Sequence, residues 1–123
     1  MSVVLDASAL LAFLHDEPGG ENVSPVLEDA RVSAVNWSEV LQKSLQRDVD
    51  IAGMRQEFTD VGVRFESFTP QQAETAAWLC SHTRNHGLSL ADRACLALAI
   101  DKGLPVITAE RGSRRPHTPS QWQ

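Results

Sequence analysis

The most constraining stretch of this sequence is residues 88–100, which reads LSLADRACLALAI. Residues 94–100 are all apolar, so a helix here has no polar face in its middle and must be buried on most sides. Asp92 and Arg93 nevertheless fall in the first turn of that helix. Ser89 followed by Asp92 is a capping-box pattern, so Asp92 either only caps the helix or also faces a site at its N-terminus.

The size and composition are those of one small globular domain. The chain has 123 residues, of which 42% are hydrophobic and 22% are charged, and two domains would not fit comfortably in this length. No apolar run is long enough to span a membrane, and residues 1–6 lack the basic segment of a secretory signal, so we expect a cytoplasmic protein. Cys80 and Cys95 lie in helical patterns and are expected to be reduced core residues.

The net charge is −5 at pH 7, whereas proteins that bind phosphates usually present a basic surface. The basic residues Arg111, Arg114 and Arg115 stand near the end of the chain, with no acidic residue after Glu110. An acidic domain can still act on nucleic acid if metal ions neutralise its carboxylates. Composition therefore leaves a metal-dependent nucleic-acid enzyme open, while the absence of cysteine and histidine clusters argues against a zinc site.

Short apolar segments alternate with helical patterns along the chain. Strands are expected at residues 3–5, 31–35, 63–68 and 105–108, and helices at residues 7–14, 22–28, 37–47, 51–58, 70–84 and 90–102. This alternation predicts an α/β sandwich with a parallel sheet. Residues 112–123 contain two prolines and no apolar periodicity, so they are predicted to form an irregular tail after a domain of residues 1–111.

Two of these helices have predicted buried faces. Asn36 is expected to be the N-cap of the third helix, with Glu39 in the capping-box position. The buried residues of this helix are predicted to be Trp37, Val40, Leu41 and Leu45. In the helix that Pro70 opens, the predicted buried residues are Ala73, Ala76, Ala77 and Cys80, which leaves Trp78 off the buried face.

Four acidic residues occupy comparable places in this scheme. Asp6 ends the first strand, Glu39 and Asp92 lie in the first turns of helices, and Glu110 follows the last strand by two residues. In a parallel sheet with right-handed crossovers, the helix N-termini lie beside the carboxyl ends of the strands, where ligands bind. The pattern therefore predicts that all four carboxylates meet at one edge of the sheet.

Clustered carboxylates repel one another unless a cation lies between them, and Mg²⁺ or Mn²⁺ is the cation that prefers such oxygen ligands. An ion held there can activate water and shield a phosphodiester. Ser8 and Thr108 are candidates to hydrogen-bond the ligands from behind. Taken singly, Asp6 and Glu39 also fit as helix caps and Glu110 fits as a surface residue. Their coincidence at one edge favours a metal site.

Four segments give the chain a family resemblance: VVLDASALLA at 3–12, VNWSEV at 35–40, GLSLADRACLALA at 87–99 and LPVITAER at 104–111. With these segments the chain resembles the PIN-domain nucleases, and most closely the toxins of bacterial VapC-type toxin–antitoxin pairs. The resemblance implies a metal-dependent endoribonuclease, a three-layer α/β/α fold with about four parallel strands, and a homodimer. It also implies an antitoxin that inserts a peptide near the acidic groove, often with a basic side chain toward the carboxylates.

Asp6, Glu39 and Asp92 match the acidic positions of the family directly. Glu110 stands where the family usually has Asp, so its carboxylate is one methylene farther from the backbone. Members of the family usually continue into a final edge strand, which residues 112–123 do not resemble, and such a loss would expose the edge of the fourth strand.

The hypothesis for catalysis assigns the four acids to metal binding. Asp6 and Asp92 hold one Mg²⁺ or Mn²⁺, Glu39 binds a metal water or helps to deprotonate the attacking one, and Glu110 completes the site. Lys43, Arg47 and Arg93 are candidates to meet RNA phosphates, although each also fits as a solvated surface charge.

Two other functions remain open at this point. A degenerate PIN domain that binds RNA or a protein without cutting is favoured by Glu110 and the unusual tail. Phosphatases that form an aspartyl-phosphate also begin with an apolar strand ending in Asp, but they usually have a second Asp where this chain has Ser8. Metal-dependent cleavage of RNA separates the first alternative from the nuclease.

Overall fold

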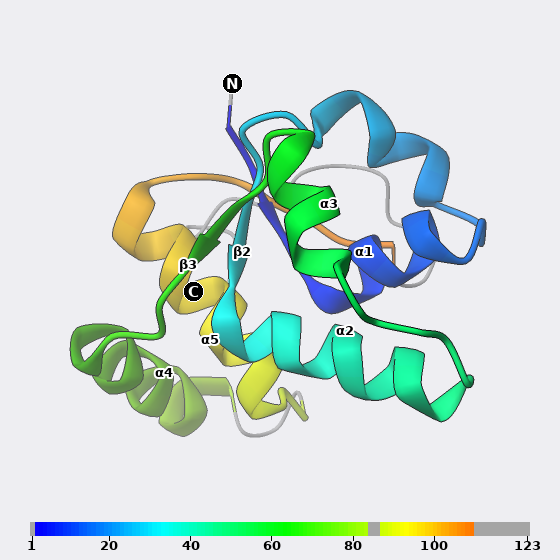
Figure 1. The fold of residues 1–123 in the computed structure, drawn as a ribbon. Helices are drawn as coiled ribbons and strands as arrows, with labels where there is room; N and C mark the ends of the chain where they lie inside the picture. The colour runs from blue at the N-terminus through cyan, green and yellow to red at the C-terminus, as the bar shows by residue number, and fades with distance from the viewer. Residues whose placement is uncertain (1, 84–86, 110–123) are drawn as a thin grey trace.

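The computed structural model describes residues 2–83 and 87–109 (Figure 1). It contains one parallel sheet with the strand order β3-β2-β1-β4. The strands are β1 (Val4–Leu5), β2 (Arg31–Ser33), β3 (Arg64–Glu66) and β4 (Val106–Ile107). The predicted parallel sheet of four short strands is confirmed, although each strand is shorter than the apolar segment that contains it. Val4 pairs with both Arg31 and Val106, so the first strand lies in the middle of the sheet.

Helices cover both faces of this sheet and complete the predicted three-layer sandwich. They are α1 (Ala7–Leu14), α2 (Ala34–Gln46), α3 (Met54–Asp60), α4 (Pro70–Thr83) and α5 (Leu90–Lys102). Figure 1 shows α1 and α3 on one side of the sheet and α4 and α5 on the other. Two short 3₁₀ turns, Gly20–Asn22 and Ser24–Val26, replace the single helix predicted for residues 22–28. No helix within the described ranges is long and apolar enough to cross a membrane.

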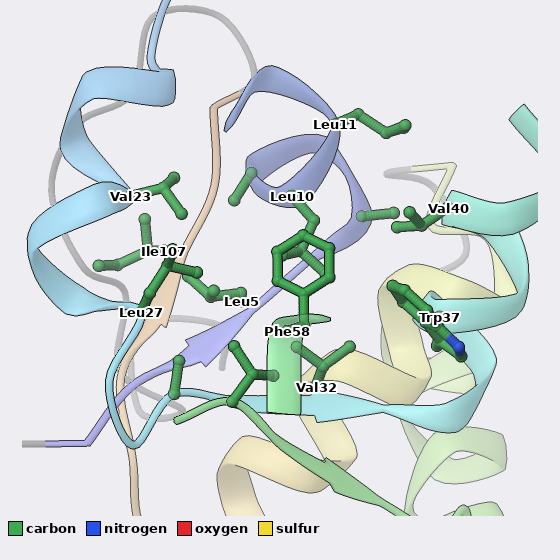
Figure 2. Close-up of a cluster of buried hydrophobic side chains, with 14 of the residues drawn as sticks. Leu5, Leu10, Leu11, Val23, Leu27, Val32, Trp37, Val40, Phe58 and Ile107 are labelled. Atoms are coloured by element: carbon green, nitrogen blue, oxygen red, sulfur yellow. The ribbon is translucent and has the colours of Figure 1, made fainter. Parts of the chain in front are cut away.

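Successive side chains of β1 enter different hydrophobic clusters, because neighbouring residues of a strand point to opposite faces. Leu5 packs with Leu10, Trp37 and Phe58 in the larger cluster (Figure 2). Trp37 and Phe58 meet edge to face, with ring centroids 5.8 Å apart. Val4 packs against α5 and β4 in the smaller cluster. Burial on both faces explains why the sequence of this strand is continuously apolar.

Helix α5 has the buried middle that its sequence predicts, because residues 94–99 are all buried. Both hydrogen bonds of the predicted capping box are present, from Asp92 N to Ser89 Oγ and from Ser89 N to Asp92 Oδ2. The helix ends at Gly103, whose φ of 65° is the left-handed conformation that favours glycine at this position. Strong signals at both ends therefore fix where this helix begins and stops.

The start of α2 differs from the prediction. The helix begins at Ala34, with Ser33 as the N-cap accepting a hydrogen bond from Val35 N. The prediction of Asn36 as N-cap is therefore wrong, and so is the capping box with Glu39. Asn36 is a buried residue of the first turn instead. Ser33 is an equally good cap in sequence, and the parallel ladder of β2 ends there.

The buried face of α4 is also different from the predicted one. Gln72, Ala76 and Leu79 are buried, whereas Ala73, Ala77 and Cys80 are exposed. The alanines on several faces of this helix give only a weak hydrophobic contrast, and Gln72 is buried because its Nε2 donates to Asp101 on α5, at 3.1 Å. Both cysteines are free as expected, but only Cys95 is a core residue. Trp78 is 52% exposed, in agreement with its predicted position off the buried face of this helix. On α2, Leu45 is exposed rather than buried.

Candidate active site

A cleft of about 420 Å³ opens at the carboxyl edge of the sheet. Its polar lining comes from α1, α2, α5 and the segment between α1 and the first 3₁₀ turn. Among the described residues, this lining contains four carboxylates, Asp6, Glu17, Glu39 and Asp92, and two cations, Lys43 and Arg47. Four negative charges against two positive ones leave the cleft with an excess of two negative charges. Such a site favours a cationic ligand.

Asp6 is the most constrained of these carboxylates. It follows β1 directly and is the N-cap of α1, where its Oδ1 accepts hydrogen bonds from Ala9 N at 2.9 Å and Ser8 Oγ at 2.7 Å. Its own N–H donates to Ile107 O of β4 at 3.3 Å. The capping role and the position in the cleft are therefore compatible. The end of β1 and the start of α1 together fix the direction of this side chain.

Burial raises the pKa of Asp6 above its usual value, because it removes the ionised carboxylate from water. Hydrogen bonds from Thr108, Ala9 and Ser8 lower the pKa in part, and the carboxylate of Asp92 raises it. Asp6 and Asp92 line the same cleft. A cation bound beside Asp6 would favour its ionised form and so offset the increase in this pKa.

The Ser8 hydroxyl connects Asp6 to the end of the last strand. Besides donating to Asp6, Ser8 Oγ lies 2.9 Å from Thr108 Oγ1 and accepts a hydrogen bond from Ala109 N at 3.1 Å. Ser8 and Thr108 thus form a hydrogen-bonded chain that ends at Asp6. They orient a carboxylate of the cleft from opposite ends of the chain.

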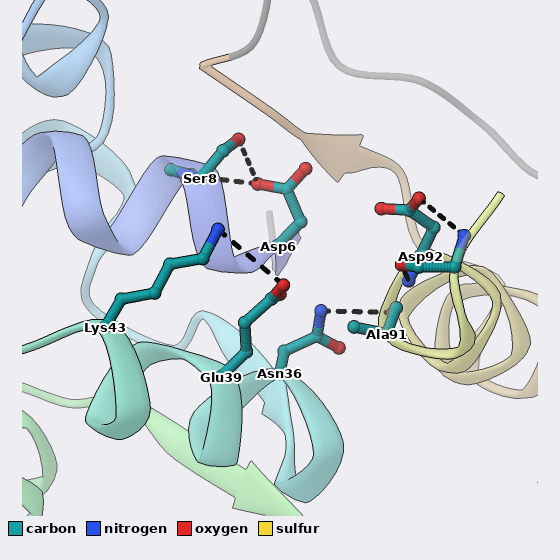
Figure 3. Close-up of polar contacts among 9 residues, drawn as sticks. Asp6, Ser8, Asn36, Glu39, Lys43, Ala91 and Asp92 are labelled. Atoms are coloured by element: carbon teal, nitrogen blue, oxygen red, sulfur yellow. Dashed lines mark hydrogen bonds and ion pairs between the residues drawn. The ribbon is translucent and has the colours of Figure 1, made fainter. Parts of the chain in front are cut away.

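Glu39 and Asp92 complete the acidic lining from two different helices. Figure 3 shows Asp6, Glu39 and Asp92 brought together from the start of α1, from α2 and from α5. Asp92 Oδ2 accepts the capping hydrogen bond from Ser89 N, at 3.0 Å. Glu39 Oε2 lies 3.8 Å from Lys43 Nζ in an ion pair along α2. The sequence prediction that these three acids meet is consistent with their positions in the cleft.

One wall of the cleft depends on a glycine. Gly19 has a φ of 96°, and a Cβ added there would lie 2.9 Å from the Cβ of Ala109. This close approach brings the loop that carries Glu17 and Pro18 against the end of β4. Glu17 then pairs with Arg47 across the cleft, where the distance from Oε2 to Nη2 is 3.2 Å.

The remaining candidates lie elsewhere. Arg93 Nη1 donates to Ala76 O of α4 at 2.9 Å, and Arg93 is not part of the cleft lining. The structure therefore does not bring Arg93 together with the carboxylates. Glu110, predicted to complete the site, lies outside the described residues.

Two polar residues that line the cleft are not among the site residues predicted from the sequence. Glu17 follows α1 in a polar loop, where no sequence pattern distinguishes a site residue from a surface residue. Asn36 did give a signal, since it precedes Glu39 by one helical turn and so lies on the same side of α2. The capping pattern predicts a helix cap at Asn36, but a polar residue flanked by apolar ones in a first turn also fits a buried polar contact.

The donor chemistry of the cleft fits a hard divalent cation. Carboxylate and amide oxygens are the protein ligands that Mg²⁺ and Mn²⁺ prefer. Within residues 2–83 and 87–109, no three acidic, histidine or cysteine side chains converge closely enough to hold an ion directly. Asp6, Glu39 and Asp92 nevertheless offer carboxylate oxygens, the type of ligand that such an ion prefers, along one cleft.

Comparison with known proteins identifies the fold independently. Among solved structures, a toxin–antitoxin complex from Klebsiella pneumoniae is similar to this chain with a TM-score of 0.69 and 16% identity, covering 94% of this chain and 98% of the other. VapC20 of Mycobacterium tuberculosis, a sarcin–ricin loop cleaving toxin, has a TM-score of 0.71 and 14% identity, with 89% and 90% coverage. FitAcB from Neisseria gonorrhoeae has a TM-score of 0.68 and 24% identity, with 93% and 91% coverage.

Comparison of the sequence gives no match to an individual curated protein but a match to a family model. No curated protein sequence matches the chain at a significant level. The family model of the PIN domain, in contrast, matches residues 3–116, which include the whole described sheet and all four predicted acidic positions. The chain therefore belongs to the PIN domain family.

Proposed function

We propose that this protein is a divalent-metal-dependent endoribonuclease and acts as the toxin of a toxin–antitoxin pair. The observation that carries the proposal is the partly buried Asp6, which shares a cleft with Glu39 and Asp92 at the carboxyl edge of a PIN sheet. VapC20, which has the same fold, is a toxin that cleaves the sarcin–ricin loop. The catalytic unit in this proposal is residues 1–111, followed by the tail of residues 112–123.

Each polar residue of the cleft has a task in this proposal. Asp6 and Asp92 would hold the ion, and Glu39 would bind one of its waters or accept a proton from the attacking water. Mg²⁺ or Mn²⁺ would supply a polarised water and would shield the charge of the phosphodiester. Ser8 and Thr108 keep Asp6 oriented. Glu110 is proposed as a further carboxylate of the same site.

The substrate path follows the exposed side of α2. Glu39, Lys43 and Arg47 are spaced four residues apart, which places them at intervals of about 6 Å along the helix. That interval resembles the separation of successive phosphates in an extended single strand. We propose that Lys43 and Arg47 bind backbone phosphates next to the scissile one. The ion pairs with Glu39 and Glu17 hold these cations beside the cleft before RNA arrives.

The proposal includes a protein partner and a second copy of the chain. One of the similar structures is a toxin–antitoxin complex from Klebsiella pneumoniae, and another is VapBC-1 from nontypeable Haemophilus influenzae. We propose a cognate antitoxin whose basic side chain enters the acidic cleft, and a homodimer as the functional form. In this proposal, the toxin and its antitoxin act in the cytoplasm, where the RNA substrate is. Light scattering of the purified chain tests the dimer directly.

A binding module without nuclease activity is the second candidate. It is favoured by the finding that, among the described residues, no three acidic, histidine or cysteine side chains gather closely enough to hold a metal ion directly. Such a protein would bind RNA or a partner with the cations of α2 and would not cut. Cleavage assays decide between the two functions.

The deciding experiment is cleavage of a mixed pool of structured RNAs by partner-free protein in Mg²⁺, in Mn²⁺ and in EDTA. The Asp92→Asn variant is the matched control, because asparagine can still accept the capping hydrogen bond from Ser89. The nuclease proposal expects metal-dependent cutting that Asp92→Asn eliminates. Absence of cutting by folded wild-type protein would reject it in favour of the binding module.

A further inference from the structure

Glu17 is the carboxylate of the cleft that has no part in the proposed metal site. It lines the cleft with Asp6, Glu39 and Asp92, but it comes from the loop after α1 and not from a strand end or a helix start. A further negative charge in this place opposes the binding of RNA, which is itself a polyanion. The position of Glu17 therefore requires an explanation in terms of its own contacts.

The backbone of Glu17 is held in place by hydrogen bonds on both sides. Its N–H donates to Ala12 O of α1 at 2.9 Å, and its carbonyl oxygen accepts from Gly20 N at 3.0 Å. The loop also packs against the end of β4, where Gly19 approaches Ala109. A loop whose backbone groups are paired within the protein presents its side chains from a defined position. Glu17 is thus fixed to one wall of the cleft.

Arg47 faces Glu17 from the other wall. It is the C-cap of α2, and its N–H donates to Ser44 O at 3.0 Å. Its guanidinium donates from Nη2 to Oε2 of Glu17 at 3.2 Å, between residues that lie 30 positions apart in the chain. This ion pair therefore joins the loop after α1 to the end of α2.

A carboxylate and a phosphate are alternative partners for Arg47. The planar guanidinium presents its N–H groups to the oxygens of either anion in the same way. A nitrogen that donates to Glu17 offers fewer N–H groups to a phosphate, and the two anions repel one another beside the same arginine. Full contact between Arg47 and a phosphate thus requires Glu17 to withdraw.

The ion pair is of a kind that exchanges readily. The side chain of Glu17 is 43% exposed and that of Arg47 is 49% exposed, so water screens both charges. The pair of Arg31 and Glu66 is shorter, at 2.7 Å, and only about half as exposed. RNA brings several phosphates at once, which favours it over a single carboxylate in competition for Arg47.

We infer that Glu17 occupies the phosphate-binding position on Arg47 in the free protein, and that RNA binds by replacing this carboxylate with a backbone phosphate. The inference rests on the proposed role of Arg47 in binding RNA. It makes Glu17 a specificity-determining residue, because the carboxylate opposes the binding of an isolated phosphate. A substrate must then make further contacts, as with Lys43, to displace it.

RNA binding in EDTA tests the inference, because a metal-dependent nuclease does not cut under this condition. The measurement is the fluorescence anisotropy of a labelled single-stranded oligouridine with the purified full chain, at low ionic strength. We expect Glu17→Gln to bind this RNA about two- to fivefold more tightly than the wild type, the range expected for release of an exposed ion pair. Thermal unfolding shows that the variant is folded.

Asp16→Asn is the matched control. It removes the same charge from the neighbouring residue, which is exposed and lies outside the cleft lining. Asparagine tolerates the positive φ of 55° at this position. We expect a clearly smaller gain in affinity from Asp16→Asn, because only the general repulsion of RNA is reduced.

Arg47→Gln completes a double-mutant cycle. Without the guanidinium, Glu17 has no phosphate-binding position to occupy, so the exchange is abolished. We expect Glu17→Gln in the Arg47→Gln background to gain no more affinity than Asp16→Asn does in that background. The difference between the two backgrounds measures the coupling of Glu17 to Arg47.

The outcomes separate this inference from the proposed nuclease. Equal gains from Glu17→Gln and Asp16→Asn would overturn the inference, as would a gain from Glu17→Gln that persists undiminished with Arg47→Gln. Weaker binding by folded Glu17→Gln, or no RNA binding by the wild type and Glu17→Gln, would also overturn it. If the exchange is found but the wild type cuts no RNA in Mg²⁺ or Mn²⁺, the inference stands and the nuclease proposal fails.

Discussion

The hydroxyl of Ser8 donates a hydrogen bond of 2.7 Å to Oδ1 of Asp6. The same hydroxyl accepts a hydrogen bond from the backbone of Ala109, so one small side chain links the carboxylate at the start of the chain to the end of β4. The orientation of Asp6 is therefore a property of the assembled sheet. The predictions below test how the function depends on that assembly.

Replacement of Asp6 by asparagine separates its role as the N-cap of α1 from its proposed role as a metal ligand. Asparagine is as good an N-cap as aspartate, so we expect α1 and the fold to persist. Loss of the negative charge should reduce Mg²⁺-dependent cleavage by more than about 100-fold, because a ligand rather than an outer partner is lost. Gel assays of RNA cleavage and circular dichroism measure the two effects, with the exposed Glu74→Gln as a control. Cleavage that persists in Asp6→Asn would remove Asp6 from the mechanism.

The raised pKa of Asp6 predicts a pH-dependent stability difference. An acid with a folded-state pKa above its unfolded value stabilises the fold below the unfolded pKa and loses that contribution as pH rises through the folded pKa. In EDTA, the wild type should therefore lose stability relative to Asp6→Asn as pH rises from about 3.8, the ordinary value, through the raised pKa. Thermal unfolding of both proteins across this range measures the difference. A constant difference would contradict the raised pKa.

Ser8→Ala tests the orientation of Asp6 without removing a carboxylate. We expect a loss of roughly 10- to 100-fold in cleavage, typical of residues that orient metal ligands, and a decrease of about 1 kcal/mol in the free energy of unfolding from lost hydrogen bonds. Ser38→Ala is the control, since Ser38 is exposed on α2. Equal activity of the two variants would show that Asp6 is oriented without the hydroxyl.

The cations of α2 are predicted to act on substrate binding. Lys43→Gln and Arg47→Gln should each raise the KM for RNA with little change in kcat, and each should reduce the slope of log affinity against log salt by about 1. Lys102→Gln, an exposed cation at the far end of α5, is the control. Arg93→Gln should lower thermal stability and leave KM unchanged, because Arg93 contacts the backbone of α4. The opposite result for Arg93 would place it on the substrate path.

Two glycines with positive φ offer a matched test of the cleft wall. Gly19→Ala introduces both a left-handed alanine and a contact of 2.9 Å with Ala109, whereas Gly53→Ala introduces only the former, since nothing lies within 4 Å. The backbone cost is of order 1 kcal/mol at each position. We expect Gly19→Ala to cost more, measured by urea unfolding, and to lower cleavage as well. Equal costs would mean that the loop moves freely away from β4.

Much of the fold was predictable because local signals agreed with the global arrangement. The alternation of apolar strands and helices predicts the parallel sheet. The capping box of Ser89 and Asp92 correctly predicts Leu90 as the first residue of α5. The place of Asp6, Glu39 and Asp92 in one cleft also agrees with the sequence pattern, because βα units direct strand ends and helix starts to one edge.

Other features depend on contacts that the sequence does not encode locally. The buried side of α4 could not be read from a helix with alanines on several faces, since burial there is decided by the amide of Gln72 reaching Asp101. The buried position of Asn36 likewise depends on Ala91, which lies 55 residues away. Polar contacts between helices that are distant in sequence leave no periodic pattern, so the sequence alone does not predict them.

The pairing of β1 with β4 has a consequence in time. Asp6 N donates to Ile107 O, and Ser8 binds Thr108 and Ala109, so the carboxylate that leads the cleft is fixed by residues translated about a hundred positions later. A nascent chain on the ribosome lacks that support until β4 has left the exit tunnel. The enzyme proposed here would thus acquire its cutting site only after β4 and the residues that follow it have emerged from the ribosome.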